Sequence, residues 1–384
     1  MKLLKLGRLE KPIGRWRDAL HVFDRISVLK LYKDELEDSS FSYIKVNNNL
    51  SIRVLAKLAS LLNEKKNASW ILDLAFSLLR YPATVQIRKQ LKKCEYDYVH
   101  VSYNDYDESA LLLVLIHPFL KKDALITRAY KETRPEWKYM ERKSFILSDR
   151  VVLNAEENIT FFEKKYGKDI FTGKTVLTGL DEDAIGEEYV NKVKYAEKLS
   201  TVDNRRHMVI LCGRAFSDTS DPRSGSRLFY VAMIKEFLES GFVVHLHTLK
   251  IFPDKNGVNQ YEVLREKYKD SFFIESPLSF DDAHFEESYK VLSRYDYGVL
   301  HNFVEGTPNT EFDKYNIPHR YYEYELAHVA PILLKGKTIV MQRIMKEEKT
   351  GIVYSKPSDI SLTDKCNYKI SVFSDYIKSI YCNS

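Results

Sequence analysis

Short apolar runs alternate with amphipathic stretches along almost the whole chain. In the first half, runs typical of buried strands lie at residues 2–6, 26–32, 41–46, 96–102, 124–127, 151–154 and 175–178. Between them, apolar residues recur at helical spacing in stretches that include 50–64, 69–80, 83–93 and 107–117. Strands that alternate with helices in this way predict a parallel sheet covered by helices.

The second half repeats the same alternation. Strand patterns lie at 207–212, 242–248, 272–275, 297–301, 330–334 and 351–354, with helical patterns that include 228–239, 320–327 and 366–382. A charged segment at about 181–206, with a mostly polar helical run at 187–199, separates the halves. We therefore predict an α/β protein of two Rossmann-like, doubly wound domains, at 1–185 and 200–364.

Composition and charge narrow the class of protein. With 384 residues, 44% of them hydrophobic and 29% charged, each half can bury its own core. The net charge of +5 is too mild for a dedicated nucleic-acid module, so we expect no nucleic-acid partner. The four cysteines lie far apart, and the longest apolar stretch, 111–116, is too short to span a membrane. A cytoplasmic protein is the simplest expectation.

Ligands of open parallel sheets bind at the carboxyl ends of the strands, which directs attention to three segments of the second half. Gly213 and Arg214 follow an apolar strand and open a loop that also carries Arg223 and Arg227, a set suited to a diphosphate. Arg320, Tyr322 and Glu323 begin a helix, where a carboxylate could hold two vicinal hydroxyls of a ribose. The third segment is the polar loop 302–318. For each, an ordinary solvated loop or helix start is the alternative.

Histidines offer no obvious metal site. His245 and His247 lie two apart on one strand, with no third ligand in view, and His100 lies inside a strand pattern where a core histidine is expected. We therefore expect neither a metal nor a catalytic histidine.

Together these segments resemble the GT-B glycosyltransferases that use nucleotide-sugar donors, in the group-one family. The resemblance is a series of weak motifs over about 96–355: Tyr96-Asp-Tyr-Val-His100, the segment from Glu141 to Gly167, Val176-Leu-Thr-Gly179-Leu-Asp181, Gly213-Arg214, Tyr295-Asp-Tyr-Gly298, Pro318-His-Arg320-Tyr-Tyr-Glu323-Tyr324 followed by Ala330-Pro331, and Lys349-Thr-Gly351-Ile352.

The resemblance implies two domains that face each other across a cleft, with the C-terminal helix, about 365–384, returning to the first. It implies metal-independent transfer of a hexose or related sugar to an acceptor hydroxyl in glycan, polysaccharide or glycolipid assembly, with no cofactor because the nucleotide-sugar is a substrate. The donor would contact Gly213, Arg214, Arg223, Arg227, Arg320, Tyr322 and Glu323. A glycan or lipid-linked acceptor would lie near Gly7, Gly14, Tyr103, Arg128, Tyr130 and Glu141.

The chain departs from the family pattern in three places. No lysine occurs between Ala215 and Asp221, Tyr315 takes the place of a glutamate eight positions before Glu323, and His328 replaces a glycine. These departures leave open a non-catalytic, sugar- or nucleotide-binding partner of an active transferase. A nucleotide-sugar epimerase is a further alternative, although no convincing acid/base set is visible for it.

Peripheral membrane contact is a separate hypothesis. Arg15-Trp16-Arg17 and a helix with leucines at 55, 58 and 62 and with Lys57, Lys65 and Lys66 combine the residue types of an interfacial helix. The alternative is that these leucines pack a domain core.

Overall fold

The computed structural model describes residues 1–6, 15–30, 39–45, 50–62, 69–102, 108–120, 125–129, 138–179, 184–219, 228–281, 283–300, 314–336, 338–364 and 366–382. The chain divides into two compact units. Unit 1 comprises Met1–Glu182 and Phe373–Ser384, and unit 2 comprises Asp183–Val372. The C-terminal helix therefore packs with the first unit.

Unit 1 is built on a seven-stranded sheet with the order β3-β2-β1-β4-β5-β6-β7, and every pairing in it is parallel. The strands are β1 (Lys2–Leu6), β2 (Arg25–Lys30), β3 (Ser42–Lys45), β4 (Tyr98–Ser102), β5 (Leu125–Ala129), β6 (Arg150–Leu153) and β7 (Thr175–Leu177). The strand order reverses between β1 and β4, which is the doubly wound topology that the alternating pattern predicts.

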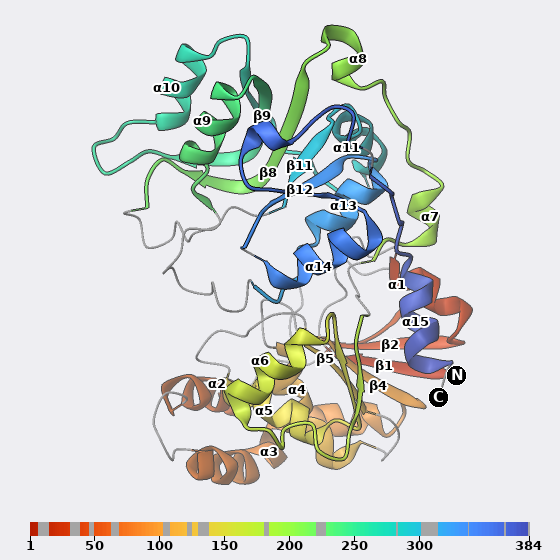
Figure 1. Ribbon diagram of the computed structural model, residues 1–384. Coiled ribbons are helices and arrows are strands. Elements are labelled where there is room, and N and C mark those ends of the chain that lie inside the picture. Colours follow the sequence, from red (N-terminus) through yellow and green to blue (C-terminus); the bar gives the residue numbers. More distant parts are fainter. Residues whose placement is uncertain are drawn as a thin grey trace. The chain divides into compact units, whose positions relative to one another are not determined.

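Helices lie on both sides of this sheet (Figure 1). They are α1 (Arg15–Asp18), the 3₁₀ turn η1 (Ala19–His21), α2 (Leu50–Leu62), α3 (Ser69–Leu91), α4 (Glu108–Ile116), η2 (His117–Phe119), α5 (Lys138–Leu147), α6 (Glu157–Tyr166) and α15 (Phe373–Tyr381). Leu111–Ile116 of α4 are all buried, as expected for a helix that is apolar on all sides. The prediction of two separate helices at 69–80 and 83–93 is wrong, because α3 is one continuous helix that contains Pro82.

A cluster of aromatic side chains joins α15 to β1, β2 and η1. Trp16 and Phe23 are fully buried there against Phe373 and Tyr381 of the C-terminal helix. Trp16 therefore belongs to the core, and so does Leu55, with 0% of its surface exposed. For Trp16 and Leu55 the alternative, a packed core, is correct, and peripheral membrane contact stays a prediction. No helix in the described ranges is long and apolar enough to cross a membrane.

Unit 2 repeats the topology with six parallel strands in the order β10-β9-β8-β11-β12-β13. They are β8 (Arg206–Phe216), β9 (Phe242–Phe252), β10 (Phe272–Glu275), β11 (Tyr297–Val299), β12 (Ala330–Leu334) and β13 (Ile352–Tyr354). The order reverses between β8 and β11. The prediction of two doubly wound halves is therefore confirmed, and the cleft expected between them stays a prediction.

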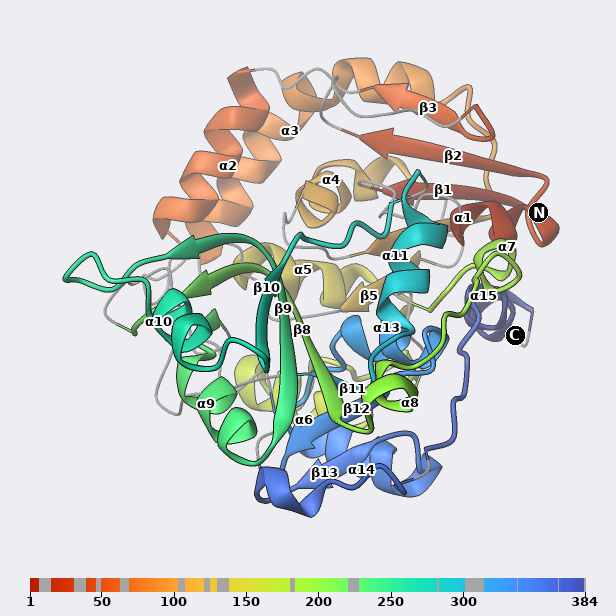
Figure 2. The same ribbon diagram turned by 90° about the horizontal axis from the view of Figure 1, so that it is seen from above.

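The helices of unit 2 are α7 (Glu187–Val190), α8 (Leu199–Asp203), α9 (Val231–Glu239), α10 (Gln260–Lys267), α11 (Phe285–Leu292), α13 (Arg320–Leu326), α14 (Ile339–Glu348) and the 3₁₀ turn η5 (Pro357–Asp359). Figure 2 shows α9 and α10 on one side of β8 and β9, with α11 on the other. The single helix expected at 187–199 is wrong, because α7 and α8 are separate.

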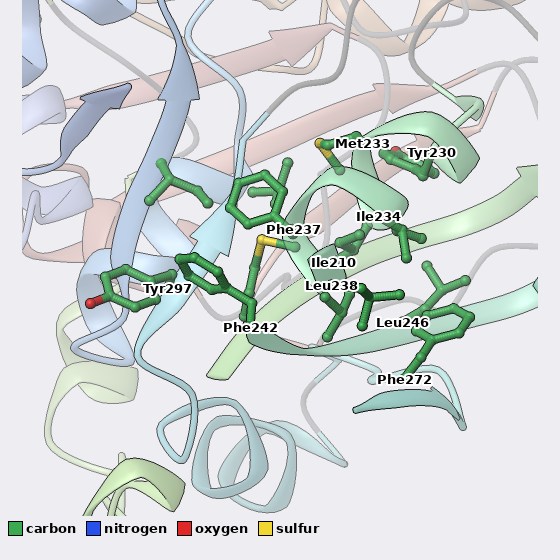
Figure 3. Close-up of a cluster of buried hydrophobic side chains, with 14 of the residues drawn as sticks. Ile210, Tyr230, Met233, Ile234, Phe237, Leu238, Phe242, Leu246, Phe272 and Tyr297 are labelled. Carbon is green, nitrogen blue, oxygen red and sulfur yellow. The ribbon is translucent and has the colours of Figure 1, made fainter. Parts of the chain in front are cut away.

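The core of unit 2 forms where α9 packs on the sheet (Figure 3). Ile234 and Phe237 of α9 are buried against Ile210 of β8, Phe242 of β9 and Tyr297 of β11. Ile234, Phe237 and Leu238 recur at the spacing of one helix face, which is the signal that predicts this helix from the sequence. Phe242 and Tyr297 are the first residues of β9 and β11, so this packing holds the sheet at the amino ends of these strands, away from the carboxyl ends where ligands of such sheets bind.

Candidate functional site

The first turn of α13 carries an ion pair at the carboxyl edge of the unit 2 sheet. The Arg320 Nη1 atom donates to Glu323 Oε2 over 2.6 Å, and 22% and 13% of the two side chains remain exposed. Burial disfavours the guanidinium charge, but the Glu323 carboxylate, with Tyr324 and Tyr230 close by, outweighs that effect, and the pKa of Arg320 is raised. The pair is therefore a charged, partly accessible group in which each partner holds the other in place.

α13 is fixed to the sheet by a close approach between Tyr324 and Gly298. A Cβ atom at position 298 would lie 2.5–2.6 Å from three atoms of the Tyr324 ring, so only glycine leaves room for the ring. The Tyr324 hydroxyl donates to the carbonyl of Val299 over 3.1 Å. Since Val299 is the last residue of β11, this contact places the first turn of α13 beside the point where the strand order reverses.

Residues of β8 and α11 share the surroundings of the ion pair. Burial raises the pKa of the Cys212 thiol to about 11, and the nearby Arg320 guanidinium partly opposes that shift. Burial also raises the pKa of Tyr289 on α11, and the Glu323 carboxylate adds to it. Cys212 of β8 and Tyr289 of α11 thus lie within electrostatic reach of the ion pair, at buried positions where charges interact more strongly than in water.

Gly213 and Arg214 do not form the turn expected after a strand ending at Cys212. β8 continues to Phe216 and pairs along its full length with β9, with Arg214 opposite Lys250. The side chains of Arg214 and Lys250 are both exposed. Phe216 and Phe252 stack at the end of this ribbon, with ring centroids 4.6 Å apart. Two cations therefore face each other across the strand pair, and Arg214 lies two residues beyond Cys212.

The remaining donor-side residues divide into two groups. Arg223, Arg227 and most of the loop 302–318 lie outside the described residues. Tyr322 is buried and Asn316 is 5% exposed, so both belong to the packed base of α13 and not to its open surface. The structure thus brings Arg320 and Glu323 together beside β8, the strand that carries Arg214.

On the acceptor side, only Glu141 can be placed with its side chain. Glu141 is buried on α5 and lies 3.3 Å from Lys165 Nζ of α6. Gly7, Gly14, Tyr103 and Tyr130 lie outside the described residues, and only the backbone of Arg128 is described, in β5 opposite Ser102. The acceptor role of these residues stays a prediction.

Lys5, a residue that the sequence pattern does not single out, is fully buried beside His100 in unit 1. The two residues are register partners on β1 and β4, at the reversal of strand order. Lys5 Nζ lies 5.2 Å from the centre of the Trp16 ring, and His100 Nδ1 lies 2.7 Å from the Tyr381 hydroxyl. His100 is the core histidine expected. In the sequence, this burial is signalled only by the position of Lys5, a charged residue inside the apolar run Lys2–Leu6.

The histidines of unit 2 pair with each other and with acids instead of converging on one point. His207 Nδ1 lies 3.1 Å from His245 Nε2, and His207 Nε2 lies 3.0 Å from Asp203. Burial, with His207 and His247 close by, lowers the pKa of His245 to about 3. Among the described residues, no group of three or more His, Cys, Asp or Glu side chains could hold a metal ion.

Comparison with known proteins gives matches of fold at very low identity. No protein-family model and no curated protein sequence matches the chain. Among solved structures, UGT71G1 of Medicago truncatula in complex with UDP-glucose is 8% identical, with a TM-score of 0.44, over 99% of this chain and 89% of that chain. WaaG, a glycosyltransferase of lipopolysaccharide biosynthesis, is 9% identical, with a TM-score of 0.45, over 100% and 96%.

A third match is UDP-N-acetylglucosamine 2-epimerase from Rickettsia bellii, which is 9% identical, with a TM-score of 0.45, over 99% of this chain and 87% of that chain. Two transferases and an epimerase are different enzymes, and one architecture hosts many activities. At these identities and scores, the matches assign neither a family nor a reaction to this chain. The residues of its own site must supply the argument for function.

Proposed function

We propose that this chain is a glycosyltransferase that takes a nucleotide-diphosphate sugar in unit 2 and transfers the sugar to a hydroxyl of a glycan or lipid-linked acceptor. The observation that carries the proposal is the Arg320–Glu323 pair at the reversal of strand order between β8 and β11. A carboxylate there can accept two hydrogen bonds from vicinal ribose hydroxyls. A guanidinium one helical turn away can bind the diphosphate through two parallel N–H donors.

The proposed reaction needs positive charge where the leaving group forms. As the bond between the anomeric carbon and the phosphate oxygen breaks, negative charge grows on the diphosphate. Arg320 is held in place by Glu323, and Arg214 and Lys250 present two more cations on the β8–β9 ribbon. Cations fixed before the reaction stabilise this growing charge more than they stabilise the substrate. We propose that they do so without a metal ion, in the cytoplasm.

The second candidate is a non-catalytic partner that binds a nucleotide-sugar. It is favoured by the absence of lysine between Ala215 and Asp221, where the resembling family often has one. Release of nucleoside diphosphate from UDP-, GDP- and ADP-sugars distinguishes the two. An enzyme of this kind releases nucleotide slowly to water and faster with an acceptor, whereas a binding protein protects the donor.

The variant Arg320→Ala tests the site within the same assay. Removal of one preorganised donor of positive charge should lower turnover by about 10²–10³-fold. Arg265→Ala is the matched control, because Arg265 forms a 2.6 Å pair with Glu262 at the same three-residue spacing, in the reverse order, on the exposed surface of α10. Equal turnover in wild type and Arg320→Ala, with one donor clearly consumed, would remove the site from the proposal.

A further inference from the structure

Helix α3 presents apolar side chains on two opposite sides. Its inward stripe consists of residues that are at most 6% exposed, namely Leu72, Phe76, Ala83, Ile87 and Leu91. Its outward stripe consists of large apolar residues that are all exposed, namely Trp70, Ile71, Leu74, Leu78, Tyr81 and Val85. At about 100° per residue, the outward set falls within roughly 100° of arc, on the side opposite the core stripe.

The exposure of the outward stripe is large for residues of this kind. Trp70 and Tyr81 are each 64% exposed, and Leu78 is 68% exposed. Single exposed apolar residues are normal on protein surfaces, but a continuous row along a helix marks an interaction site. We call these six residues the α3 outer face.

α2 packs against α3 and carries a similar but shorter row. Leu50, Val54 and Leu61 are exposed at positions i, i+4 and i+11, which lie on one side of a helix. Arg53 and Lys57, both exposed, flank this row. The two neighbouring helices thus both expose apolar residues, and basic residues accompany them.

Charge identifies the partner. Residues 50–93 contain nine Lys or Arg against two acids, a net +7, whereas the whole chain is only +5. The one acid of α3, Asp73, is engaged by Lys143 over 2.7 Å and by the Tyr139 hydroxyl. Arg88 lies over the Tyr81 ring at 4.8 Å, at the end of the outer face. An apolar row bordered by cations fits a surface that is apolar inside and negatively charged outside.

We propose that the α3 outer face docks this chain onto an anionic lipid bilayer, with α3 lying in the interface. Trp and Tyr side chains, which place an apolar ring and a polar tip at different depths, suit the headgroup region. A second copy of this chain fits less well, because two segments of net +7 would face each other. The inference does not depend on the proposed transferase activity, since vesicle binding is read without any donor or acceptor.

The test is flotation of the full chain with vesicles of phosphatidylcholine alone and of phosphatidylcholine mixed with phosphatidylglycerol. Binding is expected only to the anionic vesicles. It should weaken as salt rises from about 0.1 M to about 1 M, because screening shortens the reach of the charges from about 10 Å to about 3 Å. The variant Leu74→Ser/Leu78→Ser should bind at least roughly tenfold more weakly.

The matched control is Val202→Ser/Leu249→Ser, which removes two apolar side chains of similar exposure, 76% and 74%, from unit 2. It should bind as the wild type does. Tryptophan emission gives a second readout: anionic vesicles should shift the emission to shorter wavelength in wild type and not in Trp70→Phe.

Three outcomes would overturn the proposal. The first is no binding to anionic vesicles at low salt. The second is equal binding by the α3 variant and wild type, with both folded by circular dichroism. The third is a dimer in wild type that the α3 variant converts to a monomer, which would make the outer face an interface between copies of this chain.

Discussion

The guanidinium of Arg320 and the carboxylate of Glu323 lie 2.6 Å apart on the first turn of α13, beside the strand-order reversal of unit 2. The pair is half buried, so its charges are less screened than those of an exposed pair. Each side chain is ordered before any ligand arrives. A ligand that binds both side chains meets them already held in this geometry. Less side-chain entropy is therefore lost on binding.

Gly298→Ala should destabilise unit 2. The added Cβ would lie 2.5–2.6 Å from the ring of Tyr324, so the ring must move. That ring is fully buried, and its hydroxyl is hydrogen-bonded to the carbonyl of Val299. Overpacking of this kind costs about 1–3 kcal/mol, which lowers the melting temperature by roughly 2–4 °C per kcal/mol in a unit of this size. Differential scanning calorimetry measures it.

Gly213→Ala is the control for this change, because nothing lies within 4 Å of a Cβ at that position. It should melt within about 1–2 °C of the wild type, since surface changes away from special features alter stability by at most about 0.5 kcal/mol. Equal shifts for the two variants would contradict the close approach of Tyr324 to β11.

Glu325→Gln should change how stability depends on pH. Burial raises the pKa of Glu325 to about 8 from an ordinary value of 4.5, although Tyr321 and Lys369 oppose the shift. Between these two values the folded state keeps a proton that the unfolded state has lost. The free energy of unfolding of the wild type should therefore fall as pH rises from about 4.5 to about 8, by about 1.4 kcal/mol for each unit of pKa difference.

The amide variant carries no such proton, so its stability relative to the wild type should rise from pH 5 to pH 9. Glu347→Gln, at an exposed position of α14, is the control and should follow the wild-type profile. Urea unfolding across this pH range measures the difference. Parallel profiles for the wild type and Glu325→Gln would show that Glu325 is ionised in the folded state.

His328 closes α13 in a conformation that favours glycine. Its φ is 53°, and the N–H groups of His328 and Val329 donate to the carbonyls of Glu325 and Tyr324, the pattern of a Schellman motif. The imidazole stacks between Tyr195 and Tyr368, with centroids 4.4 and 4.9 Å away. These rings hold a residue that the backbone alone disfavours, at the place where the resembling family has glycine.

His328→Gly should therefore be more stable than His328→Ala, by about 1 kcal/mol, because both lose the stacking and only alanine keeps the left-handed strain. At Lys235, in the middle of α9, the order should reverse, with alanine more stable than glycine by about 1 kcal/mol. Thermal melting of the four variants gives both differences. The same order at both positions would contradict the left-handed closure of α13.

Features that depend on local pattern can be predicted from this sequence, whereas features that depend on packing between distant segments cannot. Alternating strands and helices predict both sheets, and the helix expected to begin at Arg320 is α13, although the pairing of Arg320 with Glu323 was not predicted. Pro82 misled the prediction, because α3 is held by its buried row and by the Thr84 hydroxyl, which donates to the carbonyl of Arg80.

Gly213 misled it in another way. A glycine after an apolar run usually signals a turn, but β9 pairs with β8 well beyond that point. The approach of Tyr324 to Gly298, and the burial of Lys5 beside His100, join segments that no sequence spacing relates. The outer face of α3 was missed for a related reason: its apolar residues are visible in the sequence, but which of its two stripes is buried is decided by the rest of unit 1.

A thermal-shift panel measures whether Arg320 and Glu323 hold a nucleotide. Wild type, Glu323→Ala and the control Glu262→Ala are melted with UDP, GDP, ADP and CMP. A nucleotide at about 100 times its dissociation constant adds about 2.7 kcal/mol, or roughly 5–10 °C. We predict that one nucleoside diphosphate stabilises wild type and Glu262→Ala but not Glu323→Ala. Equal stabilisation of all three proteins, or of none by any nucleotide, would contradict it.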